Sequence, residues 1–233
     1  MRKNQNRLYC FSPPVMIATF VIEMSLFVYT LVRYKLTPLT KLVLAALLML
    51  ALFQLSEYNV CEGIGFSAMI WSRIGFVAIT LLPPLGLHLV QVMSGRGKRW
   101  IVWLNYLAAA GFIVTFAFYT AAFQNHVCAG NYVIFRLSDK VGRAYYAYYY
   151  GFLLIGVAMS LYFSLRAKLK IRQALILQLV GYLSFLLPTT IVNTIDPQTV
   201  SGIPSIMCGF AIIYAIILAV GIAPLAALKP KRR

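Results

Sequence analysis

The chain has 233 residues, of which 61% are hydrophobic and 11% are charged, and its formal net charge is +16. This composition is far more apolar than that of an ordinary soluble domain and excludes a soluble globular protein. The positive charge alone would suggest nucleic-acid binding, but its distribution along the chain favours a membrane protein.

Seven apolar stretches alternate with short polar loops, and each is close to the ~20 residues that a helix needs to cross a bilayer. They cover 15–32, 42–60, 71–93, 101–122, 145–165, 174–193 and 204–228. We therefore predict an all-α membrane protein, a single seven-transmembrane helix bundle over residues 1–233. We expect no soluble output domain, and no cleaved signal peptide, because the first stretch is long and contains Glu23.

The lysine and arginine residues gather in alternate loops. Fourteen of the 21 lie in loops 33–41, 94–100 and 166–173 and in the tail after Leu228, and seven lie on the other side. An excess of these residues in short loops marks the cytoplasmic side, so we expect the N-terminus outside and the C-terminus in the cytoplasm. Membrane lipids with anionic headgroups account for the basic loops, and we expect no nucleic-acid partner.

The polar groups inside the spans are the first candidates for a functional site, because such groups are costly in a membrane. With alternate spans running inward and outward, they fall mostly in the outer half of the bundle. This placement suggests a hydrated cavity that opens to the outside. The candidate ligand-binding residues are Glu23, Gln54, Glu57, Arg73, Tyr149 and Asn193.

Structural roles are the alternatives for these residues. Glu57 and Arg73 lie near the outer ends of neighbouring spans and could form an ion pair, either purely structural or as one wall of the cavity. Glu23 could bond to Gln54 and hold two helices together. His88, near the inner end of the third span, is more typical of a buried histidine with a hydrogen-bond partner than of a ligand.

Three further local signals bear on the fold. Tyr149 belongs to the tyrosine-rich run 145–150, which could be an interfacial aromatic belt, although some of its side chains must face inward. Pro83–Pro84 and Pro188 lie within spans and predict kinks. The loop 123–144 contains the β-prone segment NYVIF, which predicts a short hairpin on the outer face.

Of the four cysteines, Cys61 and Cys128 are expected on the outside, where oxidation is permitted. We predict a disulfide between them, although Cys10 could be the partner of either and the thiols could also be unrelated. Cys208 lies in the seventh span and is expected to be a small buried residue. A zinc site built from Cys10, Cys61, His126 and Cys128 is disfavoured by its weak His-x-Cys spacing, so we expect no metal and no cofactor.

Several enzyme classes lack their signature residues here. No lysine lies inside a span, as a retinal Schiff base would require. Two histidines on opposite sides of the membrane cannot supply a zinc hydrolase, and the chain has no GxSxG elbow and no P-loop. We expect that the protein is not an enzyme.

Two segments carry a family resemblance. FQLSEYNVCEG at 53–63 and WSRIGFVAITLLPPLGLHLV at 71–90 resemble the second and third spans of the seven-transmembrane sensor domain of bacterial histidine kinases. The start YCFSPP also resembles that of small bacterial multispan proteins that begin Met-Cys-Phe-Ser. The first resemblance implies a sensory input module, but no kinase follows in this chain. The residues that match the pattern are Glu57, Trp71, Arg73 and Pro83.

These signals together predict a stand-alone sensor or receptor-like module in a bacterial cytoplasmic membrane. It would bind a small or lipidic ligand in an outward-facing cavity and signal to a separate protein partner through its basic cytoplasmic loops. The alternatives are a structural or accessory subunit of a membrane complex and, third, a small-solute transporter or channel.

Overall fold

The computed structural model describes residues 13–63, 65–96, 98–129, 132–196, 199 and 202–228. Within these ranges, the side chains at 13, 124–129, 132, 134 and 226–228 are not described. Seven helical segments in this part of the chain are long and apolar enough to cross a membrane. The predicted all-α seven-helix bundle is thus confirmed as an architecture.

Each predicted stretch corresponds to one helical span, although α6 and α7 begin before the stretches 145–165 and 174–193. The long helices are α1 (Pro13–Arg33), α2 (Pro38–Glu62), α3 (Ala68–Thr80), α4 (Leu82–Ser94), α5 (Arg99–Phe118), α6 (Asp139–Ser164), α7 (Leu169–Ile195) and α8 (Ile203–Ile216). A π-helical segment η3 (Ile217–Ile222) and a 3-10 helix η4 (Ala223–Leu228) continue α8. The remaining elements are η1 (Thr120–Ala122), β1 (Phe123–Ala129) and β2 (Tyr132–Leu137).

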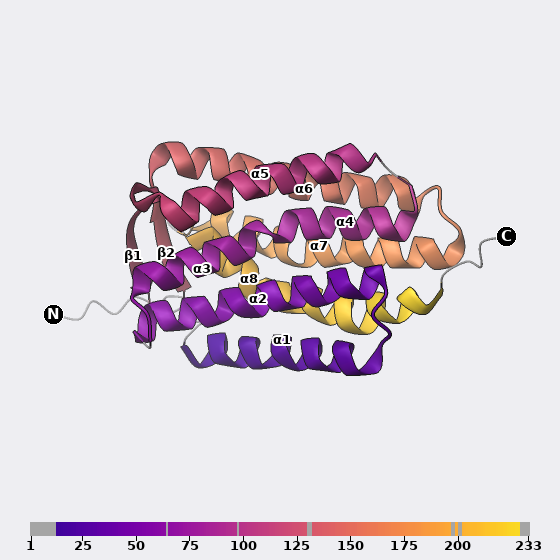
Figure 1. Ribbon diagram of the computed structural model, residues 1–233, viewed down its shortest axis with the longest axis horizontal. Helices are drawn as coiled ribbons and strands as arrows, with labels where there is room; N and C mark the ends of the chain where they lie inside the picture. The colour runs from indigo at the N-terminus through magenta and orange to yellow at the C-terminus, as the bar shows by residue number, and fades with distance from the viewer. Residues whose placement is uncertain are drawn as a thin grey trace.

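The bundle has two layers. α1, α2, α3–α4 and α5 lie side by side in one layer, and α8, α7 and α6 lie behind them in the other (Figure 1). α2, α3–α4 and α8 bury most of their apolar length, whereas α1 and α5 form the edges and leave most of theirs exposed. An apolar face exposed on an edge helix can lie against lipid tails, which are as apolar as leucine.

Local sequence signals set the ends of the central helix α2. The Thr37 hydroxyl accepts a hydrogen bond from the Thr40 backbone N–H at 3.2 Å, and Pro38 follows as the first helical residue. At the other end Gly63 adopts φ +69°, a left-handed conformation that suits glycine, and its N–H bonds to the Asn59 carbonyl.

The third span is divided at Leu81, as the proline pair predicts. Pro84 has no N–H to offer the Thr80 carbonyl four residues earlier, and the Tyr148 hydroxyl of α6 donates to that carbonyl instead, at 2.8 Å. The hydroxyl groups of Thr80 and Tyr145 are 3.2 Å apart. The backbone carbonyl left without a donor at this helix break is therefore hydrogen-bonded by a side chain of a neighbouring helix. By contrast, α7 continues through Pro188 without a break.

The predicted hairpin is confirmed, and it shortens the fourth span. α5 ends at Phe118, so the expected span to residue 122 was too long at this end. β1 and β2 pair in antiparallel register, with Cys128 opposite Val133, and form a small two-stranded sheet beyond the helix ends. We call the end of the bundle that carries this sheet the hairpin end.

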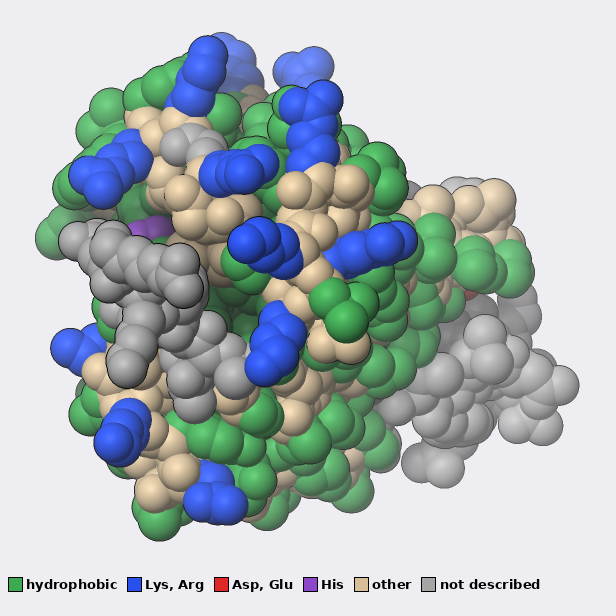
Figure 2. Space-filling model, turned by 90° about the vertical axis from the view of Figure 1, so that its right-hand side faces the viewer, with side chains coloured by type: hydrophobic (Ala, Val, Ile, Leu, Met, Phe, Trp, Pro, Cys, Tyr) green, Lys and Arg blue, Asp and Glu red, His purple; other side chains and the backbone are tan. Residues whose placement is uncertain are grey.

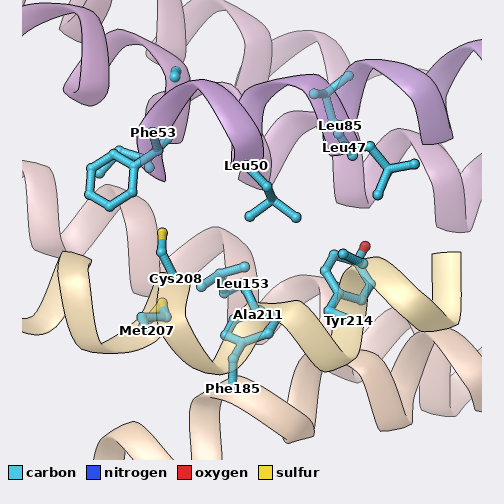
Figure 3. Packing of buried hydrophobic residues seen from close by; sticks show 14 of the residues in the cluster. Leu47, Leu50, Phe53, Leu85, Leu153, Phe185, Met207, Cys208, Ala211 and Tyr214 are labelled. Carbon is cyan, nitrogen blue, oxygen red and sulfur yellow. The ribbon is translucent and has the colours of Figure 1, made fainter. Parts of the chain in front are cut away.

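The core is aromatic near the hairpin end, and a second aromatic group of Tyr182, Phe185 and Tyr214 lies further along the bundle. Tyr145, Tyr148 and Tyr149 are buried, so the tyrosine run is not simply an interfacial belt. Tyr145 packs with its ring centroid 5.6 Å from that of Phe76 and 4.9 Å from that of Phe116. Figure 3 shows the central part of the core, where α2 and α4 residues face those of α6, α7 and α8.

The opposite end of the bundle, which we call the basic end, is strongly positive. It presents the loops after α1, α4 and α6, and Figure 2 shows Lys and Arg side chains around its rim. No aspartate or glutamate occurs in these loops. The exposed cations of the described loops are Arg33, Lys35, Lys41, Arg96, Lys98, Arg99, Arg166, Lys168, Lys170 and Arg172.

Candidate functional site

Two acidic side chains meet inside the bundle. Glu23 of α1 is 0% exposed and Glu57 of α2 is 1% exposed, and their carboxyl groups are close enough to interact electrostatically. Neither oxygen of Glu23 has a hydrogen-bond partner among the described residues, and neither does Oε1 of Glu57. A buried polar group without a partner costs ~1–3 kcal/mol. Packing alone gives no reason to place two such groups together.

A serine links this acidic pair to the hairpin. Ser205, at the start of α8, is 2% exposed, and its side chain is hydrogen-bonded to Glu57. The same hydroxyl oxygen accepts a hydrogen bond from the Val133 backbone N–H of β2 at 3.4 Å. Because it accepts from the backbone, the hydroxyl can donate its own hydrogen to the carboxyl group. The buried acid is thus coupled to the strand through one side chain.

The cluster continues along α8 and α2. Cys208, one turn after Ser205, is a buried free thiol within electrostatic reach of both carboxyl groups. Its sulfur is directed from α8 toward α2 (Figure 3). Cys208 and Tyr149 line a small internal cavity of about 20 Å³, the space of about one water molecule. Gln54, 3% exposed, precedes Glu57 by three residues on the same face of α2.

The structure places Arg73 elsewhere, so the ion pair with Glu57 that the sequence suggested is not formed. The Nη1 atom of Arg73 donates to the Ala117 carbonyl of α5 at 3.2 Å. Arg73 therefore serves the contact between α3 and α5, whereas Glu57 faces α1 and α8 through Glu23 and Ser205. Sequence spacing gives the depth of a residue in a span but not the direction it faces.

Asn193 also lies apart from the acidic pair. Its side-chain oxygen accepts a hydrogen bond from the Thr199 hydroxyl at 2.7 Å, and the same hydroxyl lies 2.6 Å from the Asp196 carbonyl. These hydrogen bonds cap the C-terminal end of α7. The candidate site is therefore Glu23, Glu57 and Ser205, bordered by Gln54, Cys208 and Tyr149, and we call these six residues the buried polar cluster. Ser205 carries no charge, so the sequence analysis did not single it out.

The predicted disulfide and the disfavoured zinc site both involve residues at the hairpin end. Cys61 is half-buried at the end of α2 and is not a free thiol. All of Cys10 and the side chains of His126 and Cys128 lie outside the described residues, so the Cys61–Cys128 disulfide stays a prediction. Within the described residues, no group of three or more His, Cys, Asp or Glu side chains could hold a metal ion.

Comparison with known proteins finds no matching family model, no matching curated protein and no matching solved structure. The class that the fold defines is a multi-pass membrane protein with seven candidate spans.

Proposed function

We propose that this protein is a seven-helix sensor or receptor-like module of a bacterial cytoplasmic membrane. It takes a small or lipidic ligand into an outward-facing cavity and passes a helix rearrangement to a separate protein partner. The ligand carries a hydrogen-bond donor or a positive charge, because it must complement the two carboxyl groups of the buried polar cluster.

The observation that carries this proposal is the unpartnered acidic pair. Three of the four carboxyl oxygens of Glu23 and Glu57 have no hydrogen-bond partner among the described residues. Burying charge or polarity without compensation is unfavourable, and buried ionisable groups in membranes are characteristic of functional sites. A donor or cation on the ligand would compensate these oxygens when it binds.

The position of α8 suggests how ligand binding could be transmitted from the buried polar cluster to the basic end. Ser205 and Cys208 lie near the beginning of this helix, and α8 continues through η3 and η4 toward the basic end. A ligand that takes the place of Ser205 at Glu57 would free the Ser205 hydroxyl and shift the start of α8. The π-helical segment η3 is a type of irregularity often found at functional positions. A separate partner would read the movement at the basic end.

Thermal unfolding in detergent tests the ligand site directly. The probes are a total bacterial lipid extract and a panel of small amines and other polar metabolites. At least one probe is expected to raise the melting temperature of the wild-type protein, and Glu57→Gln is expected to abolish that rise. The melting temperature of ligand-free Glu57→Gln should stay close to the wild-type value, because an amide is less costly to bury than a carboxylate and its oxygen can still accept the hydrogen bond of Ser205.

Ser160→Ala is the matched control. Ser160 is a fully buried polar residue of α6, and its hydroxyl bonds to the Gly156 carbonyl of its own helix at 2.8 Å. This variant should keep the ligand response. If every probe leaves the wild-type protein unchanged, and a second protein co-purifies with it in fixed stoichiometry, the accessory-subunit alternative replaces the sensor. Solute flux into liposomes would instead identify a transporter.

A further inference from the structure

A cleft at the basic end, separate from the buried polar cluster, has the form of an anion-binding site. It has a volume of about 530 Å³ and lies between α2, α4 and α5. This volume is within the range of ~300–1,000 Å³ that is typical of ligand sites. Its lining residues are Leu42, His88, Gln91, Val92, Gly95, Arg96, Arg99, Val102, Trp103 and Tyr106.

Two helical stripes form the walls. Along α4 and its C-cap the lining residues follow the spacing i, i+3, i+4, i+7 from His88 to Gly95, and on α5 the same spacing runs from Arg99 to Tyr106. Seven residues of α-helix span ~10 Å, so the cleft extends about two turns into the bundle. Leu42 of α2 completes the lining.

The chemistry changes along the cleft. At the mouth, Arg96 and Arg99 are both exposed, and the Arg96 N–H donates to the Ser94 hydroxyl at 3.2 Å, which orders the turn. The first turn of α5 has no side-chain cap, so its N–H groups add to the positive field at the mouth. At the deep end, Nδ1 of His88 lies 3.3 Å from the Tyr106 hydroxyl. The polar pair His88–Tyr106 thus lies deeper in the cleft than the two arginines.

Between these ends the lining is apolar. Val92 and Val102 face the interior of the cleft, and Trp103, 72% exposed, forms its outer wall. Tryptophan is enriched where the headgroups of a bilayer begin. An occupant therefore meets charge at the mouth and hydrocarbon a few ångströms further in.

We propose that this cleft binds a phosphate-bearing anion at Arg96 and Arg99. Arginine recognises phosphate through two parallel N–H···O bonds, and no carboxylate occurs in the loops of this end to compete with it. The occupant that fits the whole cleft is an anionic phospholipid, with its phosphate at the mouth and its apolar part against Val92, Val102 and Trp103. A soluble phosphate ester would use the same arginines without the apolar contact. This inference does not depend on the proposed sensor function.

Tryptophan quenching by brominated lipids tests the cleft. In a Trp71→Phe/Trp100→Phe background, Trp103 is the one tryptophan left of the three. Nanodiscs of phosphatidylcholine are doped with brominated phosphatidylglycerol or, separately, with brominated phosphatidylcholine. We expect stronger quenching by the anionic lipid at equal content. Arg96→Gln/Arg99→Gln should lower that preference by about tenfold, because these two arginines bind the lipid phosphate directly in the cleft.

Arg166→Gln/Arg172→Gln is the matched control, because it removes two exposed cations from the same end but none from the cleft. It should keep most of the preference. Val92→Phe fills the apolar part without a change in charge and without a second tryptophan, and it should weaken quenching by the anionic lipid as well. Melting temperatures of all variants show that each remains folded.

Inorganic phosphate distinguishes the two sources of the anion. If the occupant is a lipid, millimolar phosphate leaves the melting temperature unchanged while phosphatidylglycerol raises it. A rise with phosphate that is lost in Arg96→Gln/Arg99→Gln identifies a soluble phosphate ester at the same site. Equal quenching by the two lipids with no effect of phosphate, or equal losses in the cleft and control variants, would overturn the proposal.

Discussion

Single residues decide what the interior of this bundle can bind. Glu23 and Glu57 are both buried and meet each other rather than a cation. Ser205 supplies a hydrogen bond to one of them, and three carboxyl oxygens remain without a partner among the described residues. Arg73 is occupied by a backbone carbonyl of α5. Arg73 therefore does not neutralise the acidic pair, as it would in a structural ion pair with Glu57.

Separate surroundings for Glu57 and Arg73 predict that their substitutions act independently. Glu57→Gln and Arg73→Gln should change the unfolding free energy additively, within the ~0.5 kcal/mol expected for residues that share no partner. Arg73→Gln alone should destabilise the protein, because the Ala117 carbonyl loses its donor. Unfolding of the single and double variants in mixed micelles measures both effects. A coupling of several kcal/mol would mean that the two side chains contact each other after all.

At the scale of the elements, the interrupted third span is the main mechanical feature. α3 and α4 meet at Leu81. Because Pro84 has no N–H, the Thr80 carbonyl lacks its usual donor within the helix, and the Tyr148 hydroxyl of α6 donates to it instead. α4 then packs closely on α7, with Gly86 against the ring of Tyr182. Helices in lipid associate through such close contacts of small residues and through interhelical hydrogen bonds.

Removing the hydroxyl of Tyr148 tests whether its hydrogen bond to the Thr80 carbonyl stabilises the break between α3 and α4. Tyr148→Phe should destabilise the protein by ~1–3 kcal/mol, because the buried Thr80 carbonyl loses its donor. In a Pro84→Ala background the loss should be smaller, since the alanine would offer its own N–H to that carbonyl. Tyr150→Phe, on the same helix and half-buried, is the control. Equal losses from Tyr148→Phe with and without Pro84 would show that the hydroxyl serves another role.

Gly86 tests the close packing of α4 on α7. A Cβ at this position would overlap the Tyr182 hydroxyl, so Gly86→Ala should destabilise the bundle by ~1–3 kcal/mol through overpacking. Gly111 of α5 has no atom within 4 Å of the same added carbon. Gly111→Ala should therefore be neutral or stabilising, because alanine favours the helix. Melting temperatures of the two variants in one detergent should show a loss for Gly86→Ala and none for Gly111→Ala.

At the scale of the whole molecule, charge separates the two ends. The loops of the basic end carry cations without a single aspartate or glutamate, whereas the hairpin end carries Glu62, Asp139 and Asp196 beside its basic residues. The orientation stays an expectation, and it rests on the excess of Lys and Arg in these short loops rather than on the distribution of Asp and Glu. The charge asymmetry also gives the cleft at Arg96 and Arg99 an uncompensated positive field.

Thiol labelling in intact cells tests this orientation. Lys140→Cys, at the hairpin end, should react with a membrane-impermeant maleimide added outside, and Lys168→Cys, at the basic end, should react only after permeabilisation. The physical reason is the barrier that the bilayer presents to a charged reagent. Labelling of the parent protein sets the background of native cysteines. The reverse pattern would place the N-terminus inside and the proposed cavity on the cytoplasmic side.

Mass mapping of non-reduced peptides tests the cysteine pairing. We expect a peptide pair linked through Cys61 and Cys128, which would tie the hairpin to the end of α2. Cys128→Ser should then release a reactive thiol at Cys61 and lower the melting temperature, since disulfides typically contribute ~2–4 kcal/mol. A Cys61–Cys10 peptide would instead identify the N-terminal segment as the element tied to α2.

The amino-acid sequence is enough to predict the seven spans, a kink at the proline pair, the hairpin and the separation of charge between the two ends, whereas Pro188, where a kink was also predicted, does not interrupt α7. These features depend on apolar length, on proline chemistry and on residue counts in loops, all of which are local in the chain. The packing of the helices determines that Glu57 faces Glu23 and Ser205 rather than Arg73, and that residues of α4 and α5 line a cleft with His88 and Arg99. Hydropathy places a residue at a depth in the membrane, but the rotation of each helix and the identity of its neighbours follow from side-chain packing between helices.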